Sequence, residues 1–129
     1  MKAAIPYLMF SGTCREALMF YKTCLDGEIV SIQTVGESPL DVPVEHQARI
    51  FDSEFRAENV RFKASDDMPG NAVSVGANFA IFVTFTDPAE QKQVFDNLSE
   101  GGQVQFPLEN NFGMIVDKYQ VQWMLAFEG

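Results

Sequence analysis

Cysteine and histidine are scarce in this sequence of 129 residues, which has two cysteines and one histidine. Cys14 and Cys24 fall ten residues apart in one predicted helix. That separation is about 15 Å along a helix axis, so the two thiols cannot form a disulfide with each other. We therefore expect free thiols and a reducing compartment, the cytoplasm.

Positive charge and long apolar runs are lacking as well. Nine basic against eighteen acidic residues give a formal net charge of −9, which repels both phosphate backbones and anionic lipid surfaces. No apolar run approaches the roughly 20 residues needed to span a bilayer, and no basic start leads into an apolar stretch. The sequence predicts a soluble protein with neither nucleic acid nor a membrane as a partner.

Apolar residues are nevertheless plentiful enough for a hydrophobic core. They make up 47% of the chain, and twelve phenylalanines, three tyrosines and one tryptophan are among them. This composition is far from that of a disordered chain. At this length we expect a single domain over residues 1–129.

The strongest pattern in the chain is an internal repeat. Thr13 and Asp87 each offer a side-chain oxygen before a helical stretch and are each followed three residues later by Glu, as in a capping box. The two residues lie 74 positions apart. Gly27 and Gly101, which we expect to end the helices in left-handed backbone geometry, have the same separation. Two copies of one unit are therefore predicted.

Each copy is predicted to contain a strand, a helix and three further strands. In the first copy, about residues 3–66, these are a strand ending near Phe10, a helix over 14–25, and strands over 28–35, 44–51 and 60–65. In the second copy, about residues 78–128, they are a strand over 78–85, a helix from Pro88, and strands near 103–106, 111–117 and 121–127. Residues 66–77 connect the two.

This order of elements predicts an α+β fold. Two βαβββ repeats would form a curved mixed sheet with the helices outside. The concave inner face of such a sheet is left for another occupant, and apolar concavities with few polar groups are the usual sites for small molecules.

Four motifs carry a resemblance to a known family: Gly12-x-x-x-Glu16-Ala17-Leu18-x-Phe20-Tyr21, Ser65-Asp66-x-x-Pro69-Gly70, Gly101-Gly102-x-Val104 and Phe112-Gly113-x-x-x-Asp117. With the paired repeats they resemble the vicinal oxygen chelate superfamily, which includes glyoxalase I, extradiol dioxygenases and bleomycin-resistance proteins. The match is closest to the PhnB-like branch. The resemblance implies a glyoxalase-like cup over nearly the whole chain.

Metal enzymes of that superfamily carry His or Glu at four positions on the first and last strands of each repeat. The resemblance places these positions on or beside Pro6, within residues 62–64, on or beside Asn78, and on or beside Met124. None of these is a His, Asp or Glu, whereas Zn²⁺, Fe²⁺ and Ni²⁺ need deprotonated nitrogen, sulfur or carboxylate ligands. We therefore predict no metal. No glycine-rich nucleotide motif is present either, and no other cofactor is predicted.

The residues predicted to line the cup are Tyr7, Asn78, Phe106, Phe112, Trp123 and Met124. Alternate residues of a strand point to opposite faces, so one of Trp123 and Met124 faces the helices and the other faces the cup. The resemblance implies that Met124 stands where a metal ligand would be. Ordinary core packing is the alternative for the aromatic residues.

His46 is the leading candidate for a catalytic residue. The alternation of Val44, His46, Ala48 and Ile50 in a predicted strand would turn it toward apolar neighbours, where it could act as an acid or base near neutral pH. The alternative is a strand-end histidine in solvent or at a subunit contact, since a histidine without a positioned partner is not a catalytic unit.

Two other candidates have a structural alternative. Asp66 and Asp67 could act as paired carboxylates or could serve a turn. Cys14 lies in the first turn of a helix, where the helix dipole lowers a thiol's pKa, but its place on the apolar stripe indicates burial.

The sequence thus favours a PhnB-like protein that binds an unidentified small molecule and lacks the usual metal ligands. The alternative is a glyoxalase-like lyase or isomerase that uses His46. A third possibility is an assembly role through exposed strands. We expect a homodimer, and whether the repeats pair within one chain or between two chains stays open.

Overall fold

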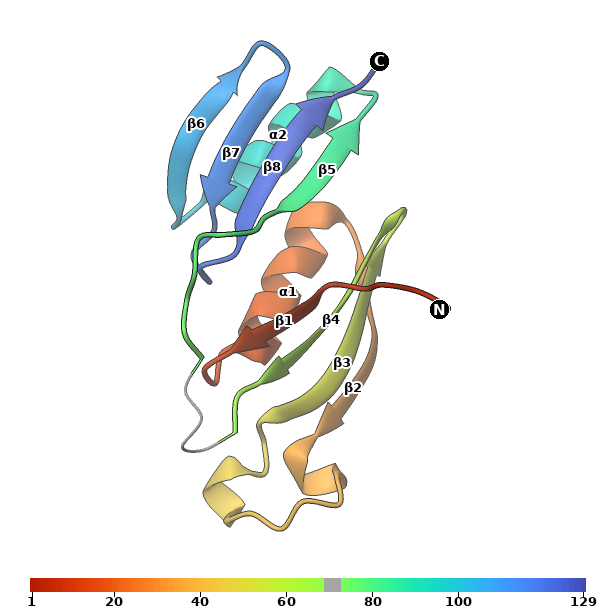
Figure 1. Ribbon diagram of the computed structural model, residues 1–129, viewed down its shortest axis with the longest axis vertical. Coiled ribbons are helices and arrows are strands. Elements are labelled where there is room, and N and C mark those ends of the chain that lie inside the picture. Colours follow the sequence, from red (N-terminus) through yellow and green to blue (C-terminus); the bar gives the residue numbers. More distant parts are fainter. Residues whose placement is uncertain (69–72) are drawn as a thin grey trace. The chain divides into compact units, whose positions relative to one another are not determined.

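The computed structural model describes residues 1–68 and 73–129 of the chain (Figure 1). It forms two compact units, Met1–Ser74 and Val75–Gly129, and their boundary lies inside the predicted connector. Each unit holds one strand, one helix and three further strands in that order. The predicted α+β class with paired βαβββ repeats is confirmed. Pro69 and Gly70 of the second motif lie outside the described residues.

The first unit consists of β1 (Tyr7–Phe10), α1 (Cys14–Leu25), β2 (Glu28–Thr34), the 3₁₀ turns η1 (Val35–Glu37) and η2 (Val44–His46), β3 (Ile50–Ala57) and β4 (Val60–Asp66). The strands form a four-stranded sheet in the order β1-β4-β3-β2. β1 is parallel to β4, and the other neighbours are antiparallel. The sheet is therefore mixed, as predicted.

Aromatic rings join the first sheet to its helix. Phe55 of β3 and Phe62 of β4 are cross-strand partners whose rings stack 4.7 Å apart, and the ring of Tyr21 in α1 meets Phe62 edge-on at 5.6 Å. Each of the three side chains is at most 1% exposed. Complete burial of one such side chain contributes about 1.5–3 kcal/mol, so this cluster fixes the face of the sheet that α1 covers.

The second unit consists of β5 (Ile81–Phe85), α2 (Pro88–Ser99), β6 (Gln103–Glu109), β7 (Phe112–Val116) and β8 (Gln122–Phe127). Its sheet has the order β5-β8-β7-β6, which repeats the topology of the first sheet, with β5 parallel to β8. β6 is an edge strand and extends through Pro107, a residue that a sheet tolerates at its edge because it has no N–H to donate.

α2 packs closely on the second sheet. A side chain at Gly113 of β7 would come within 2.6 Å of the Phe95 ring, so this position has no room for a larger residue. The buried amide of Gln91 in α2 donates to the carbonyl oxygens of Asn111 and Leu125, both at 3.3 Å. These contacts identify the face of the sheet that carries Gly113 as the one covered by α2.

The two helices begin in different ways. Asp87 caps α2 as predicted, since its side chain accepts a hydrogen bond from the N–H of Ala89. The capping prediction for Thr13 is wrong, because its side chain makes no capping hydrogen bond. Asp66, at the end of β4, instead accepts a bond of 2.9 Å from the N–H of Cys14. The first helix is therefore capped from a strand 52 residues further along the chain.

The two helices also end differently. Gly101 has a left-handed φ of 75°, as predicted. After α1, however, the left-handed residue is Asp26, with a φ of 51°. The prediction that Gly27 ends this helix in left-handed geometry is therefore wrong. Gly27 is needed because a Cβ there would lie 2.6 Å from the Phe55 ring.

The predicted strand over residues 44–51 is wrong in its first half. Val44, Glu45 and His46 form the turn η2, in which the N–H of His46 donates to the carbonyl of Pro43, and the N–H of Arg49 donates to the carbonyl of His46. Local hydrogen bonds of this kind replace pairing with a neighbouring strand. β3 begins only at Ile50 and continues to Ala57, well past the predicted end.

No helix among the described residues is long and apolar enough to cross a membrane.

The distant cap on α1 has a measurable consequence. Asp66 is only 7% exposed and accepts from the N–H groups of both Cys14 and Ile50. Asp66→Ala removes both bonds and leaves two buried donors unpaired, so we expect the free energy of unfolding to fall by about 2–4 kcal/mol. Urea denaturation followed by circular dichroism measures this change. In the control, Thr13→Ala should cost less than about 0.5 kcal/mol, and an equal cost for both variants would contradict the assignment.

Candidate functional site

Each sheet has one face under its own helix and one face that this helix does not cover. We call the second of these the open face of the unit. Because successive side chains of a strand alternate, the covered residues Phe62 and Gly113 mark which of their neighbours lie on the open faces. The open face of each unit is a candidate site of that unit.

The open face of the second sheet is apolar. Phe82, Met124, Met114 and Phe106 are cross-strand neighbours and form one row across all four strands. Phe82 and Phe106 are 56% and 58% exposed, and the two methionines are half-buried. Four apolar side chains in one row on an exposed sheet face are typical of a binding surface rather than of scattered surface residues.

The side chains of Trp123 and Met124 lie on opposite faces of the second sheet, because the two residues are neighbours on β8. Met124 belongs to the open-face row, as the resemblance implied. Trp123 pairs with Ile115, is 0% exposed, and its indole N–H donates to a buried Asp117 oxygen at 2.8 Å. Asp117 also accepts from the N–H of Tyr119 and of Val121. The structure therefore places Trp123 in the core, and its prediction as a ligand-wall residue gains no support from this position.

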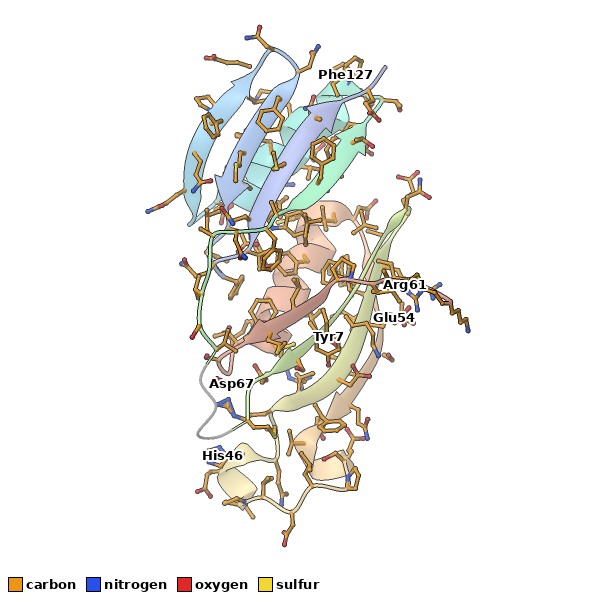
Figure 2. All side chains as sticks on the ribbon, in the orientation of Figure 1. Tyr7, His46, Glu54, Arg61, Asp67 and Phe127 are labelled. Atoms are coloured by element: carbon orange, nitrogen blue, oxygen red, sulfur yellow. The ribbon has the colours of Figure 1, made fainter. Side chains whose placement is uncertain are left out.

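The open face of the first sheet carries a polar row beside the exposed Met9 of β1. The corresponding row runs through Tyr7, Lys63, Glu54 and Ser31, which are again cross-strand neighbours on successive strands. Figure 2 shows Tyr7, Glu54 and Arg61 on the strands of this sheet. Arg61 and Arg56 both pair with Glu54, at 3.2 Å and 2.6 Å. The bonds from Arg61 and then Arg56 hold the pKa of Glu54 below its ordinary value, so this carboxylate stays charged.

Tyr7, Asp52 and Lys63 form a connected group on the same face, which we call the Tyr7 cluster. The phenol of Tyr7 donates to one oxygen of Asp52 at 3.0 Å, and the ammonium of Lys63 donates to the other at 2.9 Å. The bond to Asp52 raises the pKa of Lys63. Partial burial raises the pKa of Tyr7, and a bond with Ser65 partly offsets this. At neutral pH the phenol is therefore protonated and the ammonium charged.

The two rows occupy equivalent positions in the repeat. Tyr7 and Lys63 pair on the parallel strands β1 and β4, as Phe82 and Met124 pair on the parallel strands β5 and β8. Lys63 lies inside the segment where the resemblance placed the second metal ligand, and Met124 is at the fourth such position. One architecture thus carries a polar row in one copy and an apolar row in the other.

The other predicted ligand-binding residues are spread more widely. Phe112 of β7 is half-buried and pairs with Ala126, which puts it on the same open face as Met124. Asn78 is exposed and precedes β5. Sequence reasoning missed Asp52, Met114 and Phe82. Phe82 lies in a strand that was predicted. The register of that strand against β8, which pairs Phe82 with Met124, is the signal that would have identified it.

The four positions at which the superfamily carries metal ligands do not fit a metal here. Pro6 contributes only its carbonyl, which accepts from the N–H of Lys63. Lys63 is a cation, and Met124 and Asn78 offer no anionic donor. In the part of the chain that the structure describes, no group of three or more His, Cys, Asp or Glu side chains is placed to hold an ion.

His46 does not lie on either open face. It is half-buried in η2, and Figure 2 shows it beyond the start of β3, apart from Tyr7 and Glu54 of the same unit. The predicted alternation with Val44 and Ile50 fails because Val44 and His46 are in a turn. Within the described residues, no charged side chain is hydrogen-bonded to its imidazole, so the structure offers no support for an acid or base role.

Asp66 and Asp67 each have structural partners of their own. Asp66 holds the starts of α1 and β3, as described above. Asp67 accepts from Ser11 and from the N–H of Val73, and forms an ion pair with Arg49 at 3.3 Å. Both carboxylates are therefore used to join segments of the first unit, which agrees with the structural alternative.

Comparison with known proteins supports the predicted family. Over residues 2–126 the chain matches the family described as 3-demethylubiquinone-9 3-methyltransferase. It is 28% identical to Protein YjdN of Escherichia coli (strain K12) over 134 residues, which cover 93% of this chain and 91% of that protein.

Three solved structures resemble this chain in fold. Protein PA1353 from Pseudomonas aeruginosa is 31% identical, with a TM-score of 0.88 over 99% of this chain and 98% of that one. The PhnB protein from Bacillus cereus is 25% identical, with a TM-score of 0.77 over 98% and 100%. The fosfomycin resistance protein FosX from Listeria monocytogenes is 8% identical, with a TM-score of 0.69 over 98% and 91%, and shows likeness of fold alone.

The buried thiol of Cys14 should resist modification in the folded protein. Cys14 is 0% exposed, and burial, followed by the nearby Asp66 charge, raises the pKa of its thiol from 9.0 to about 12. Ellman's reagent at pH 8 should therefore label Cys14 only after denaturation. Because this thiol ionises more readily in the unfolded chain than in the folded protein, the free energy of unfolding should fall as the pH rises from 9 to about 12. Fast labelling of the native protein, resolved by peptide mass spectrometry, would contradict this assignment.

Removal of the imidazole at position 46 should change little. We expect His46→Ala to alter the free energy of unfolding by less than about 0.5 kcal/mol, because this half-buried side chain has no buried partner within residues 1–68 and 73–129. Urea denaturation at pH 7 measures the effect. The neighbouring Ile50, which is 1% exposed, is the positive control, and Ile50→Ala should cost about 2–4 kcal/mol.

Proposed function

This chain belongs to the family described as 3-demethylubiquinone-9 3-methyltransferase, a PhnB-like branch of the vicinal oxygen chelate superfamily, and from that membership we propose that it binds a small molecule with an apolar group. The apolar group lies on the open face of the second sheet. The row of Phe82, Met124, Met114 and Phe106 is the observation that carries the proposal.

The exposure of this row supports binding. Core side chains of the same unit, such as Leu98 and Leu125, are fully buried, whereas Phe82 and Phe106 keep more than half of their surface accessible. Covering that remaining surface with a ligand would contribute roughly 2–3 kcal/mol before the cost of association. The half-buried Met124 and Met114 between them add side chains that adapt to different ligand shapes.

An enzymatic role through His46 is the weaker alternative. His46 lies on η2 rather than on an open face, and among the residues that the structure describes it has no positioned partner of the kind that general acid or base catalysis requires. The family description names a methyltransferase. The turn from β1 to α1, however, contains a single glycine, Gly12, and the sequence has no glycine-rich cofactor loop. Binding is therefore the function that the described side chains favour.

A homodimer remains part of the proposal. A second copy of the chain could cover the same apolar row that we assign to a ligand. The two occupants differ in an observable way, since cover by a second copy depends on protein concentration. Size-exclusion chromatography with light scattering between 5 and 500 μM distinguishes them.

The apolar row predicts weak binding of ethylbenzene, measured by shifts of backbone amide signals in NMR titrations of the 14.4 kDa protein. Met124→Gln should weaken this binding about fivefold, because an amide replaces a thioether at the centre of the row. Met19→Gln is the matched control, since Met19 is 52% exposed on α1 and should leave the Kd unchanged. Ethylbenzene that shifts no amide of β5 to β8, or binds both variants equally, would refute the proposal.

A further inference from the structure

We infer that the ligand of the second sheet's open face is an organic cation. Its apolar group lies on the row of Phe82, Met124, Met114 and Phe106, and its positive charge lies beside Glu109. The inference rests on the proposed function and adds the chemical class of the ligand. Every residue that it uses to recognise the ligand belongs to the second unit.

Glu109 lies on the same face as the apolar row. It ends β6, and Asn110 and Asn111, with left-handed φ values of 52° and 67°, turn the chain back into β7 (Figure 1). A two-residue turn of this kind fixes the register of its hairpin. Glu109 is the cross-strand partner of Phe112, so the two side chains share a face. Phe112 alternates with Met114 along β7, so this face is the open one.

The carboxylate of Glu109 is available to a ligand. Glu109 is exposed, and within residues 1–68 and 73–129 no side chain forms a hydrogen bond or an ion pair with it. Glu54 on the open face of the first sheet differs in this respect, because two arginines already bind it. An ammonium group that approaches Glu109 therefore meets an acceptor that has no ion pair to give up.

The second unit has few positive charges, and its strands have none. Residues 75–129 contain two lysines against seven acidic residues, so their formal net charge is −5. Lys92 lies on α2 and pairs with Asp96 at 2.7 Å, and Lys118 lies in the turn after β7, close to Gly101. Across this fully described range, the strands place an acidic side chain and no basic one on the open face. This charge distribution favours a cation over an anion.

The aromatic side chains of the open face add to the attraction. A cation close to the face of an aromatic ring is attracted by the quadrupole of the ring, which strengthens binding at an exposed site about two- to fivefold. Phe82 and Phe106 are more than half exposed, and Phe112 is half-buried. The rings and the Glu109 carboxylate thus act on a positive charge in the same direction.

The spacing of these groups limits the size of the ligand. Phe106 pairs with Met114 and Glu109 pairs with Phe112, so the apolar row and the carboxylate are two residues of β7 apart. At about 3.4 Å per residue this separation is about 7 Å. An ammonium group joined to a phenyl ring by two carbons can therefore contact the carboxylate while the ring lies on the row.

Three probes with the same phenyl ring test the inference: 2-phenylethylamine, 2-phenylethanol and phenylacetate. At pH 7 their tails are cationic, neutral and anionic. Amide NMR titrations of the full chain at low salt give a Kd and a location for each probe. We expect the amine to shift amides of β6 and β7 and to bind about fivefold more tightly than the alcohol, and phenylacetate to bind more weakly than both. The preference should shrink at 0.5 M NaCl, because salt screens exposed charges.

Variants then identify the groups that recognise the charge. Glu109→Gln should weaken binding of the amine about threefold and leave the Kd of the alcohol unchanged, because it removes a charge and keeps the shape. Phe106→Leu should weaken binding of the amine more than that of the alcohol, because it removes a ring and keeps an apolar side chain. Glu100→Gln is the matched control. Glu100 follows α2 and lies in no strand, so this variant removes an equal charge from the unit away from the open face and should leave the Kd of the amine unchanged. Circular dichroism of each variant confirms that the fold is retained.

The outcomes separate this inference from the proposed function. Equal or tighter binding of the alcohol, or equal losses in Glu109→Gln and Glu100→Gln, would overturn the inference, while binding of the alcohol on β5 to β8 would still support the proposed function. If the alcohol and ethylbenzene fail to bind but the amine binds in a Glu109-dependent manner, the apolar proposal fails and the cation site stands. If no probe shifts an amide of β5 to β8, both are rejected.

Discussion

One helix covers only one face of a four-stranded sheet, and the properties of this molecule depend on that limit. In each unit the helix covers one face of the sheet, with the side chain of Phe62 buried under α1 and the backbone of Gly113 lying close under α2. The alternate side chains of the same strands have no helix of their own unit to cover them. What those strands carry on the open face is therefore free to differ between the two copies without loss of the core.

The two copies have used that freedom in opposite ways. On the covered faces both copies hold large apolar side chains, because each must pack against a helix to be stable. On the open faces, Lys63 in one copy stands where Met124 stands in the other. A duplicated unit with identical open faces would suit two similar ligand groups. The open faces of this chain instead differ in chemistry, so each suits a different ligand group within its own unit.

Sequence reasoning reached the fold because the periodic signals agree with one another. The apolar stripe of α1 gave its bounds, and the 74-residue offset located α2. It failed where a distant partner replaces a local signal. Thr13 looks like a cap, but the cap is Asp66, and no local pattern reports a hydrogen bond between residues so far apart. Asp52 was missed for a different reason: its strand was predicted over residues 44–51, whereas β3 runs over Ile50–Ala57.

The non-local cap of α1 bears on the order in which the chain gains structure. The start of α2 is satisfied by Asp87, two residues from the N–H that it binds, so this helix can form its cap as soon as its first turn exists. The start of α1 waits until Asp66 arrives with β4, which requires closure of a loop of about fifty residues and carries the corresponding entropic cost. Nascent helix in the C-terminal half thus needs no long-range contact to be capped, whereas the N-terminal helix becomes fully satisfied only when its sheet closes.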